Sequence, residues 1–413
     1  MVTGDANMRI GFDVTGLFWK YRTGVQNLYL GLIEGLLDLE WTYEGTEFVC
    51  IDRSGDGEHH LPFVFTDHVI LRQISALEFL PASDQLPIAL GPGTALWDRA
   101  VKGMRRRVSD RQKMRNRLLG DLDVFHVWPW DILKAPHAKH VITLTDMIPI
   151  LFAEVYSKDF VKRTRLSLEF ANQNAEHIIA ISEFTKEELT RVAGLPADKM
   201  SVVYPGVRSI FRPLEPTVVN DARHRYGVSD QPYVLTVGFL DPRKNVLGHV
   251  RAFEKLALNR QFRDLQLVLV GPESSETSRI LANLAHAQSR DRIHVTGFIP
   301  DDDLVALLNG ASVFLYCSMY EGFGFPVLEA MACGTPVVTS NTTSLPEISG
   351  DAAILVDPEN SDRIADGIES LLTDSALREQ LKVHGFERAR QFSWTKCAQE
   401  HLELYRECYS ANQ

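Results

Sequence analysis

Two glutamates in the second half of the chain lie eight residues apart, in the stretch EGFGFPVLE from Glu321 to Glu329. A carboxylate accepts hydrogen bonds, and the hydroxyls of a sugar present donors in pairs. One acid before a helix and one on its first turns are therefore suited to bracketing a phosphorylated sugar. The alternative is that Glu329 only complements a helix dipole while Glu321 is solvated.

The residues around these glutamates predict a strand, a loop, a helix and a second strand. Ala311–Ser318 is a short apolar run typical of a buried strand. Pro326 suits the start of a helix, where its missing N–H has no intrahelical partner, and Gly334 suits the helix end. A helix that begins at the carboxyl end of a parallel strand offers free N–H groups and a positive dipole end. This unit therefore predicts a phosphate site.

A pair of cations forms a second candidate for phosphate binding. The sequence DPRKN, Asp241–Asn245, follows a predicted strand at Tyr233–Phe239 and leads into a predicted helix. Arg243 can clamp a diphosphate through two hydrogen bonds, and Lys244 can act as a point charge. On its own, such a triplet is most often surface charge.

The long run that starts at Glu321, EGFGFPVLEAMACGTPVV, resembles the E-x7-E signature of the retaining glycosyltransferases of family 4, the large group of sucrose synthases and mannosyltransferases. The DPRKN segment is similar to the phosphate-binding motif of that family, and SLPE at Ser344–Glu347 matches it too. The resemblance covers most of the second half of the chain strongly and the first half weakly.

The resemblance implies an α/β fold of the GT-B type, in which two doubly wound Rossmann-like domains face each other across the active-site cleft. We expect an acceptor-binding domain at residues 1–207, a domain for the nucleotide sugar at 208–390, and a last helix at 391–413 that returns to the first domain. Tyr204–Pro216 has the composition of the linker. Short apolar runs that alternate with helical stretches favour the same parallel α/β architecture.

The implied reaction is transfer of a hexose from a nucleotide diphosphate sugar to a saccharide acceptor, with retention at the anomeric carbon. Glu321, Lys244 and Arg243 are the expected catalytic residues: the cations stabilise the leaving diphosphate, which assists deprotonation of the acceptor. No cofactor and no metal are expected, because the cations take the place of a divalent ion and Asp301–Asp303 is typical of a helix start. The expected donor-binding residues are Gly24, Gly238, Gly324, Phe325, Pro326, Val327 and Glu329.

Three positions depart from the pattern of many relatives. Thr145-Asp146 stands where they have His-Asp, so Asp146 is the surviving candidate of that pair. Phe239 stands where they have Arg, which leaves Arg243 and Lys244 to carry the charge. The loop that ends at Gly24 lacks their paired glycines, so it is equally well explained as a plain connecting turn.

Asp146, His126 and Trp128 are the acceptor-side candidates, because each follows or ends a predicted strand of the first domain. A Trp ring can stack on a sugar face, but a Trp in such a place is also commonly buried in the core. Both interpretations stay open.

Composition limits the class of protein further. The formal charge of −11 over 413 residues argues against a nucleic-acid partner. The five cysteines are odd in number and scattered, which is typical of free thiols in a reducing compartment. Neither a signal peptide nor a membrane-spanning stretch is apparent in the sequence, so we expect a cytoplasmic protein.

One segment reverses the acidic balance. Between Arg99 and Arg117, within the helix predicted over Trp97–Leu119, nine Lys or Arg residues accompany only Asp110. A basic amphipathic helix suits an anionic bilayer surface, and the acceptor would then be lipid-linked. The alternative is a solvated helix face that binds nothing.

Two other functions fit the same architecture. One is a nucleotide-sugar epimerase or hydrolase, and the other is a non-catalytic nucleotide-sugar-binding scaffold protein. Intact Glu321, Glu329 and Lys244 argue against the scaffold. The general form of the VGxxxPRKN and EGFGFP segments makes GDP-mannose the first guess for the donor, and surface polysaccharide biosynthesis the expected setting.

Overall fold

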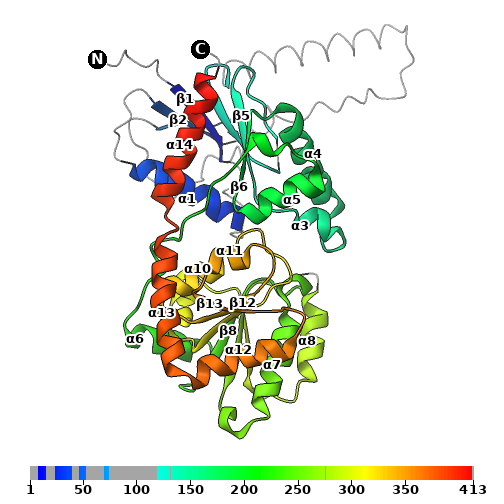
Figure 1. The fold of residues 1–413 in the computed structure, drawn as a ribbon, viewed down its shortest axis with the longest axis vertical. Helices are drawn as coiled ribbons and strands as arrows, with labels where there is room; N and C mark the ends of the chain where they lie inside the picture. Colours follow the sequence, from blue (N-terminus) through cyan, green and yellow to red (C-terminus); the bar gives the residue numbers. More distant parts are fainter. Residues whose placement is uncertain are drawn as a thin grey trace, which may run out of the picture.

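The computed structural model describes residues 8–14, 24–39, 46–52, 69–73, 119–130, 132–274 and 276–411. The described chain forms two lobes, each built on one parallel sheet, and a chain segment without helix or strand joins them (Figure 1). Most of the basic segment expected at 97–119 lies outside the described residues, and so does the loop before Gly24.

The sheet of the N-terminal lobe has the strand order β3-β2-β1-β4-β5-β6-β7 in the described part of the chain, and all its pairings are parallel. Its strands are short apolar runs bounded by turns, as the sequence predicts. Their bounds are β1 Met8–Asp13, β2 Thr46–Asp52, β3 Val69–Gln73, β4 Val124–Val127, β5 Lys139–Leu144, β6 His177–Ala180 and β7 Met200–Val202.

The helices of this lobe cover both faces of its sheet. α5 is capped at its start by the Ser182 side chain and ends at Gly194, whose φ of 67° is the left-handed conformation that glycine adopts readily. The described helices are α1 Gly24–Asp38, α3 Ile148–Leu151, α4 Lys158–Asn174 and α5 Glu183–Ala193, with 3-10 turns at Ala153–Val155 and Ala197–Lys199.

The sheet of the C-terminal lobe has the order β10-β9-β8-β11-β12-β13 and is also parallel. The central strands are buried on both faces, which explains why they are continuous apolar runs rather than alternating ones. Their bounds are β8 Tyr233–Val237, β9 Gln266–Val270, β10 Ile293–Gly297, β11 Val313–Tyr316, β12 Val337–Ser340 and β13 Ala353–Val356.

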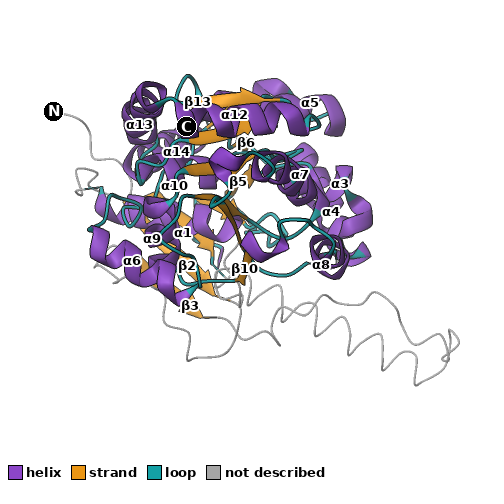
Figure 2. Cartoon of the chain, turned by 90° about the horizontal axis from the view of Figure 1, so that it is seen from below, coloured by secondary structure: helices purple, strands orange, loops and turns teal. Residues whose placement is uncertain are grey.

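Helices pack on both sides of this second sheet as well, which Figure 2 shows from below. They are α6 Pro216–Arg225, α7 Val246–Ala257, α8 Thr277–Ala285, α9 Asp301–Gly310, α10 Phe325–Ala332, α11 Leu345–Ser349, α12 Ser361–Thr373 and α13 Ser375–Arg390. Three 3-10 turns lie at Pro242–Lys244, Arg260–Phe262 and Arg290–Arg292.

Both sheets are doubly wound, and each reverses its strand order once: between β1 and β4 in one lobe, and between β8 and β11 in the other. In such sheets a crevice opens at the carboxyl ends of the strands beside that reversal. The two facing doubly wound lobes confirm the GT-B fold predicted from the sequence.

The last helix, α14 (Trp394–Ser410), crosses from the C-terminal lobe and packs along α1 of the N-terminal lobe (Figure 1). Gly31 and Gly35 make this approach possible. A Cβ on Gly31 would lie 2.1 Å from the Trp394 ring, and one on Gly35 would lie 2.5 Å from the Trp394 carbonyl oxygen. The domain boundaries expected at 207 and 390 stay predictions.

The five cysteines are free, as the sequence predicts, and all of them are buried. Among the helices described, none combines the length and apolar character needed to cross a bilayer.

Candidate active site

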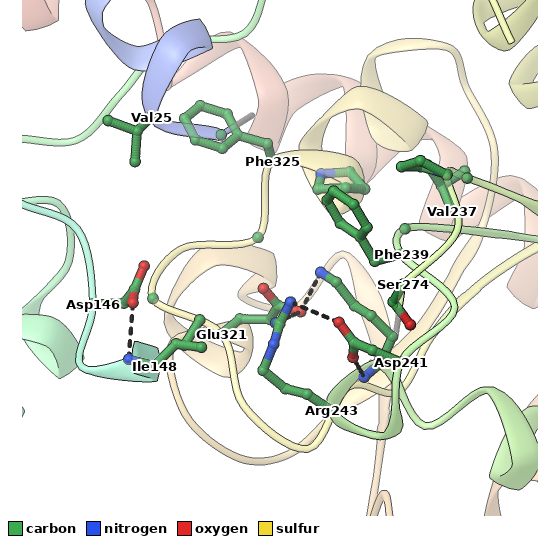
Figure 3. A pocket seen from close by; sticks show the side chains of 18 of the residues that line it. Val25, Asp146, Ile148, Val237, Phe239, Asp241, Arg243, Ser274, Glu321 and Phe325 are labelled. Carbon is green, nitrogen blue, oxygen red and sulfur yellow. Dashed lines mark hydrogen bonds and ion pairs between the residues drawn. The ribbon is translucent and has the colours of Figure 1, made fainter. Parts of the chain in front are cut away.

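A cavity of about 1430 Å³ lies between the two lobes, at the carboxyl ends of their strands. Asp146 lies on one side of it, opposite Arg243 and Phe239 (Figure 3). Most of the site residues expected from the sequence line this cavity: Gly24, Asp146, Gly238, Arg243, Lys244, Glu321, Gly324, Phe325, Pro326 and Glu329.

A three-residue ion cluster forms the charged centre of the cavity. Glu321 Oε1 accepts hydrogen bonds from Lys244 Nζ at 2.6 Å and from Arg243 Nη1 at 3.0 Å. Lys244 also donates to the Tyr316 hydroxyl and lies over the Tyr316 ring, 4.7 Å from its centre. The side chains of Lys244, Arg243 and Glu321 are only 10–12% exposed, so the charges are held in place rather than solvated.

Local hydrogen bonds fix the DPRKN turn that presents the two cations. The Asp241 carboxylate accepts from the Lys244 backbone N–H at 2.9 Å. Asn245 adopts the left-handed conformation, with φ of 56°, and its amide donates to the carbonyl oxygens of Cys317 and Pro358 at 3.0 and 2.7 Å. The turn is therefore tied directly to the chain just beyond the ends of β11 and β13.

Two glycines leave space for this arrangement. Gly238 has φ of 144°, and a Cβ there would lie 3.0 Å from Lys244 Cε. Gly271 has φ of 149°, and a Cβ there would lie 1.9 Å from the Gly238 carbonyl oxygen. A side chain at either position would displace the Lys244 chain or the strand end that supports it.

The cluster is ionised. Burial alone would raise the pKa of Glu321, but Lys244 and Arg243 outweigh burial and lower it to about 2. Burial lowers the pKa of Arg243, and the opposing carboxylates of Glu321 and Asp241 raise it above its usual range. Burial and the adjacent Arg243 lower the pKa of Lys244, with Glu321 opposing. Lys244 and Arg243 share the Glu321 carboxylate, and Arg243 Nη2 also lies 3.7 Å from the Asp241 carboxylate, so the two cations face the cavity as part of a compact network of ion pairs.

Glu329 lies on α10 in a different electrostatic environment. Its side chain is buried, and Arg208 Nη2 approaches its carboxylate at 3.9 Å. Burial raises the pKa of Glu329 to about 7, although Arg208 opposes the shift. This carboxyl therefore changes its charge near neutral pH.

The start of α10 corrects one expectation. Gly324 has φ of 115°, and Gly324, Phe325 and Pro326 line the cavity. Val327 does not line it: its side chain is fully buried and its N–H donates to the Gly324 carbonyl oxygen at 3.0 Å. Val327 faces the core because the helix turns it away from the opening, so it supports the helix start from behind.

Asp146 is a partly buried carboxyl that the N-terminal lobe contributes to the cavity. Its Oδ1 accepts from the Ile148 N–H at 2.8 Å, and the Thr145 hydroxyl donates to Oδ2 at 3.1 Å. Burial raises the pKa of Asp146, while the Ile148 hydrogen bond and Arg243 across the cavity oppose the rise. The lobes meet closely here, because a Cβ on Gly322 would lie 2.1 Å from the Thr145 carbonyl oxygen.

The expectations for His126 and Trp128 are corrected. Both side chains are buried in the N-terminal lobe, at 0% and 1% exposed, and neither lines the cavity. His126 Nδ1 lies 2.5 Å from the Tyr405 hydroxyl of α14, and its Nε2 lies 3.0 Å from the Thr143 hydroxyl. Burial and the neighbouring His401 hold the pKa of His126 well below its usual range, so the imidazole is neutral.

The cavity is also lined by residues that were not expected there from the sequence, among them Trp130, Arg208 and Tyr316. Arg208 Nη1 pairs with Asp301 at 2.6 Å beside Glu329. Tyr316 ends β11 directly before the Glu321 loop, so its position at a strand end was an available signal. Arg208 lies in the predicted linker, where nothing in the local pattern distinguishes it.

Within the described residues, no group of three or more His, Cys, Asp or Glu side chains is arranged to hold a metal ion. The expected metal independence stays a prediction, because it concerns the reaction and needs an activity measurement.

Two facing doubly wound lobes with a buried cation cluster in the cleft define a glycosyltransferase of the GT-B class. Two family patterns match this chain. Residues 220–388 match "Glycosyl transferases group 1", and residues 81–209 match "Glycosyltransferase Family 4".

Curated relatives agree with these matches. The O-antigen chain mannosyltransferase B of Escherichia coli is 35% identical over 274 residues, which cover 66% of this chain and 71% of the relative. The chain belongs to glycosyltransferase family 4. The serotype-specific mannosyltransferase WbdA of Escherichia coli is 32% identical over 271 residues, but the match spans only 33% of that longer protein.

A solved structure of the sucrose-phosphate synthase from Thermosynechococcus elongatus superposes with a TM-score of 0.69 and covers 98% of this chain and 100% of its own. At 23% identity, this likeness concerns the fold.

Proposed function

We propose that this glycosyltransferase moves a mannosyl residue from GDP-mannose to a saccharide acceptor, with retention of configuration at the anomeric carbon. The observation that carries the proposal is the buried cluster of Arg243, Lys244 and Glu321 at the centre of the cleft. The choice of mannose is supported by relatives that carry the name mannosyltransferase.

In the proposed reaction, the bond between the anomeric carbon and the diphosphate oxygen breaks, and the acceptor oxygen bonds to that carbon on the same face. The acceptor proton passes to an oxygen of the departing diphosphate. Arg243 and Lys244 stabilise the negative charge that develops on the leaving group, and they do so from a buried site where charge interactions are strong.

The two signature glutamates have separate parts in this scheme. Glu321 holds the two cations and accepts hydrogen bonds from hydroxyls of the donor sugar. Glu329, supported by Arg208, accepts from the ribose hydroxyls of the nucleotide. The raised pKa of Glu329 makes the second contact dependent on pH.

The acceptor in this proposal is a lipid-linked saccharide used to build a surface polysaccharide. Asp146, on the N-terminal side of the cavity, accepts a hydrogen bond from the reacting hydroxyl of this acceptor. The cations between Arg99 and Arg117 in the sequence supply the attraction to an anionic bilayer, where each contributes about 1 kcal/mol.

The lipid-linked part is tested separately from the transfer itself. Replacement of Arg105, Arg106 and Arg107 by Glu should abolish co-sedimentation with anionic liposomes and spare transfer to a short soluble acceptor. If the unaltered protein does not bind anionic liposomes at low salt, the membrane part of the proposal is wrong.

A panel of nucleotide sugars with the purified protein tests the donor and the reaction type. We expect GDP-mannose to be consumed fastest, and proton NMR of the product to show the anomeric configuration of the donor. Free mannose that forms equally with and without acceptor would indicate a hydrolase, and an epimerised sugar nucleotide would indicate an epimerase. Nucleotide binding without turnover would indicate a scaffold protein.

A further inference from the structure

A glutamate of the C-terminal lobe caps a helix of the N-terminal lobe. Glu347, on α11, accepts the Glu183 N–H at 2.7 Å through Oε1 and the Phe184 N–H at 3.1 Å through Oε2. These are the first two amides of α5, which have no partner inside their own helix. A carboxylate at this position gains from charge-assisted hydrogen bonds and from the positive end of the helix dipole.

The same helix start also holds the loop that carries Glu321. The hydroxyls of Ser182 and Thr185 donate to the Gly322 carbonyl oxygen, at 2.7 and 2.9 Å. From its own lobe, the Ser344 hydroxyl donates to the carbonyl oxygens of Glu321 and Phe323, at 3.0 and 2.8 Å. The backbone carbonyl groups of Glu321, Gly322 and Phe323 are thus held by two lobes. The C-terminal lobe holds the first and third through Ser344, and the N-terminal lobe holds the middle one through Ser182 and Thr185.

The position of α11 does not depend on the Glu347 side chain. Arg388 donates to the backbone carbonyl oxygens of Ile348 and Glu347, at 2.9 and 2.5 Å, and Leu345 and Ile348 are fully buried in the lobe. The Glu347 carboxylate is therefore directed outward from a helix that is anchored by other contacts.

The segment between the lobes joins the same carboxylate. The Tyr204 hydroxyl donates to Glu347 Oε1 at 2.7 Å, from the residues that connect β7 to α6. One side chain of the C-terminal lobe thus contacts both the N-terminal lobe and the connecting segment, and it is not among the residues that line the cavity.

We propose that Glu347 is a positioning residue for the transfer reaction: by capping α5 across the lobe boundary, it holds Ser182 and Thr185 against the Gly322 carbonyl and so fixes the Glu321 loop. This proposal rests on the proposed function for its kinetic part only. Loss of the cap frees the N-terminal lobe to move away, and the Glu321 loop then loses one of its two supports.

The contact is tested in the ligand-free protein by amide hydrogen exchange. The Glu183 and Phe184 amides should be protected in the unaltered protein, and Glu347→Ala should raise their exchange by at least ~10-fold, as expected for the loss of a hydrogen bond to a charged group. Amides later in α5 should keep their protection. Exchange of the two amides at unprotected rates in the unaltered protein would show that the cap does not form in solution.

The positioning role is tested by kinetics with GDP-mannose. Glu347→Ala should lower kcat by ~10-fold or more and change the affinity for GDP, measured by calorimetry, by less than threefold, because α11 and the cation cluster remain. Glu347→Gln keeps one acceptor oxygen but not the second, so its kcat should be intermediate. Glu359→Ala, at an exposed glutamate of the same lobe, is the matched control and should leave both quantities unchanged.

The outcomes separate this proposal from the proposed function. If the amides become unprotected in Glu347→Ala and kcat is unchanged, the cap exists but positions nothing, and the proposal is wrong. If Glu347→Gln behaves like the unaltered protein in both measurements, neither the charge nor the second acceptor oxygen is needed, and the proposed role of the carboxylate cap is wrong. If no nucleotide sugar is turned over by any variant, the proposed function fails, while the exchange data still decide whether the cap forms.

Discussion

The two walls of the cavity differ in kind. The C-terminal wall presents Arg243, Lys244, Glu321 and Glu329, which are ionisable groups with little exposure, held by ion pairs and hydrogen bonds. The N-terminal wall, in the part of the chain that the structure describes, is mainly apolar, with Val25, Ile148, Pro149, Phe152 and Trp130, and Asp146 is a partly buried carboxyl on it. In the proposed function, this difference assigns the charge of the reaction to the C-terminal wall and the space for the acceptor to the N-terminal wall.

The largest expected loss of activity comes from changes in the C-terminal wall, which is called the charged wall below. Lys244→Ala and Glu321→Gln should each lower kcat/KM for transfer by at least ~100-fold, because each removes one preorganised charge from the leaving group or sugar. Glu321→Gln is preferred to Glu321→Ala, because the amide keeps the side-chain volume and an oxygen that can still accept from the two cations, so that mainly the negative charge is lost.

The matched control for Lys244→Ala is Lys255→Ala, at a half-exposed lysine of the same lobe that pairs with Asp362. It should keep full activity. Near-normal turnover by a Lys244→Ala protein whose circular dichroism and melting match the unaltered protein would overturn the assignment of the charged wall.

A smaller loss of activity is expected from a change in the N-terminal wall. Asp146→Asn should lower kcat/KM by about 10- to 100-fold, the loss of one hydrogen bond between a hydroxyl and a charged group. Asp159→Asn, at an exposed position on α4, is the control. A loss as large as that of Lys244→Ala would break the comparison, because both walls would then carry the charge of the reaction.

A several-fold change in the affinity for GDP with pH should distinguish Glu329 from the other residues of the charged wall. Burial raises its pKa to about 7, so the group is neutral below that pH and a carboxylate above it. If the carboxylate accepts from both ribose hydroxyls, as proposed, the affinity for GDP should rise between pH 6.5 and pH 8.5. Calorimetry of Glu329→Gln gives the reference, since the titration of the phosphate is common to both proteins. An equal pH dependence in the two proteins would exclude Glu329 as its source.

The smallest expected change concerns metal ions. If Arg243 and Lys244 supply the positive charge at the leaving group, excess EDTA should alter the initial rate of transfer by no more than a few-fold. An activity that EDTA abolishes and manganese or magnesium restores would show that the charged wall needs a cation beyond its own side chains.

The sequence predicted the charged wall well because its parts are contiguous. DPRKN and EGFGFP each contain their own turn residues and charges, and buried parallel strands are recognisable as short apolar runs. The strand positions and the GT-B fold follow from those local signals. Arg208 was missed because its role depends on meeting Asp301 and Glu329, which come from other elements.

The N-terminal wall was predicted less well for the same physical reason. The burial of His126 depends on Tyr405, which lies 279 residues later in the chain. No local pattern near His126 indicates that a distant helix covers it, so a polar residue at a strand end looked like part of a site. Trp128 is likewise buried away from the cavity, because its ring packs against Tyr29 of α1 with 4.4 Å between the ring centres.

The crossing of α14 has a consequence for how the chain folds as it is synthesised. Cys397, Leu402 and Tyr405 complete the core of the N-terminal lobe, but the ribosome adds them only after the whole C-terminal lobe. Domains usually fold in the order in which they emerge. Here the C-terminal lobe can close its sheet while the earlier lobe still exposes the α1 face around Gly31, so the part that is made first is finished last.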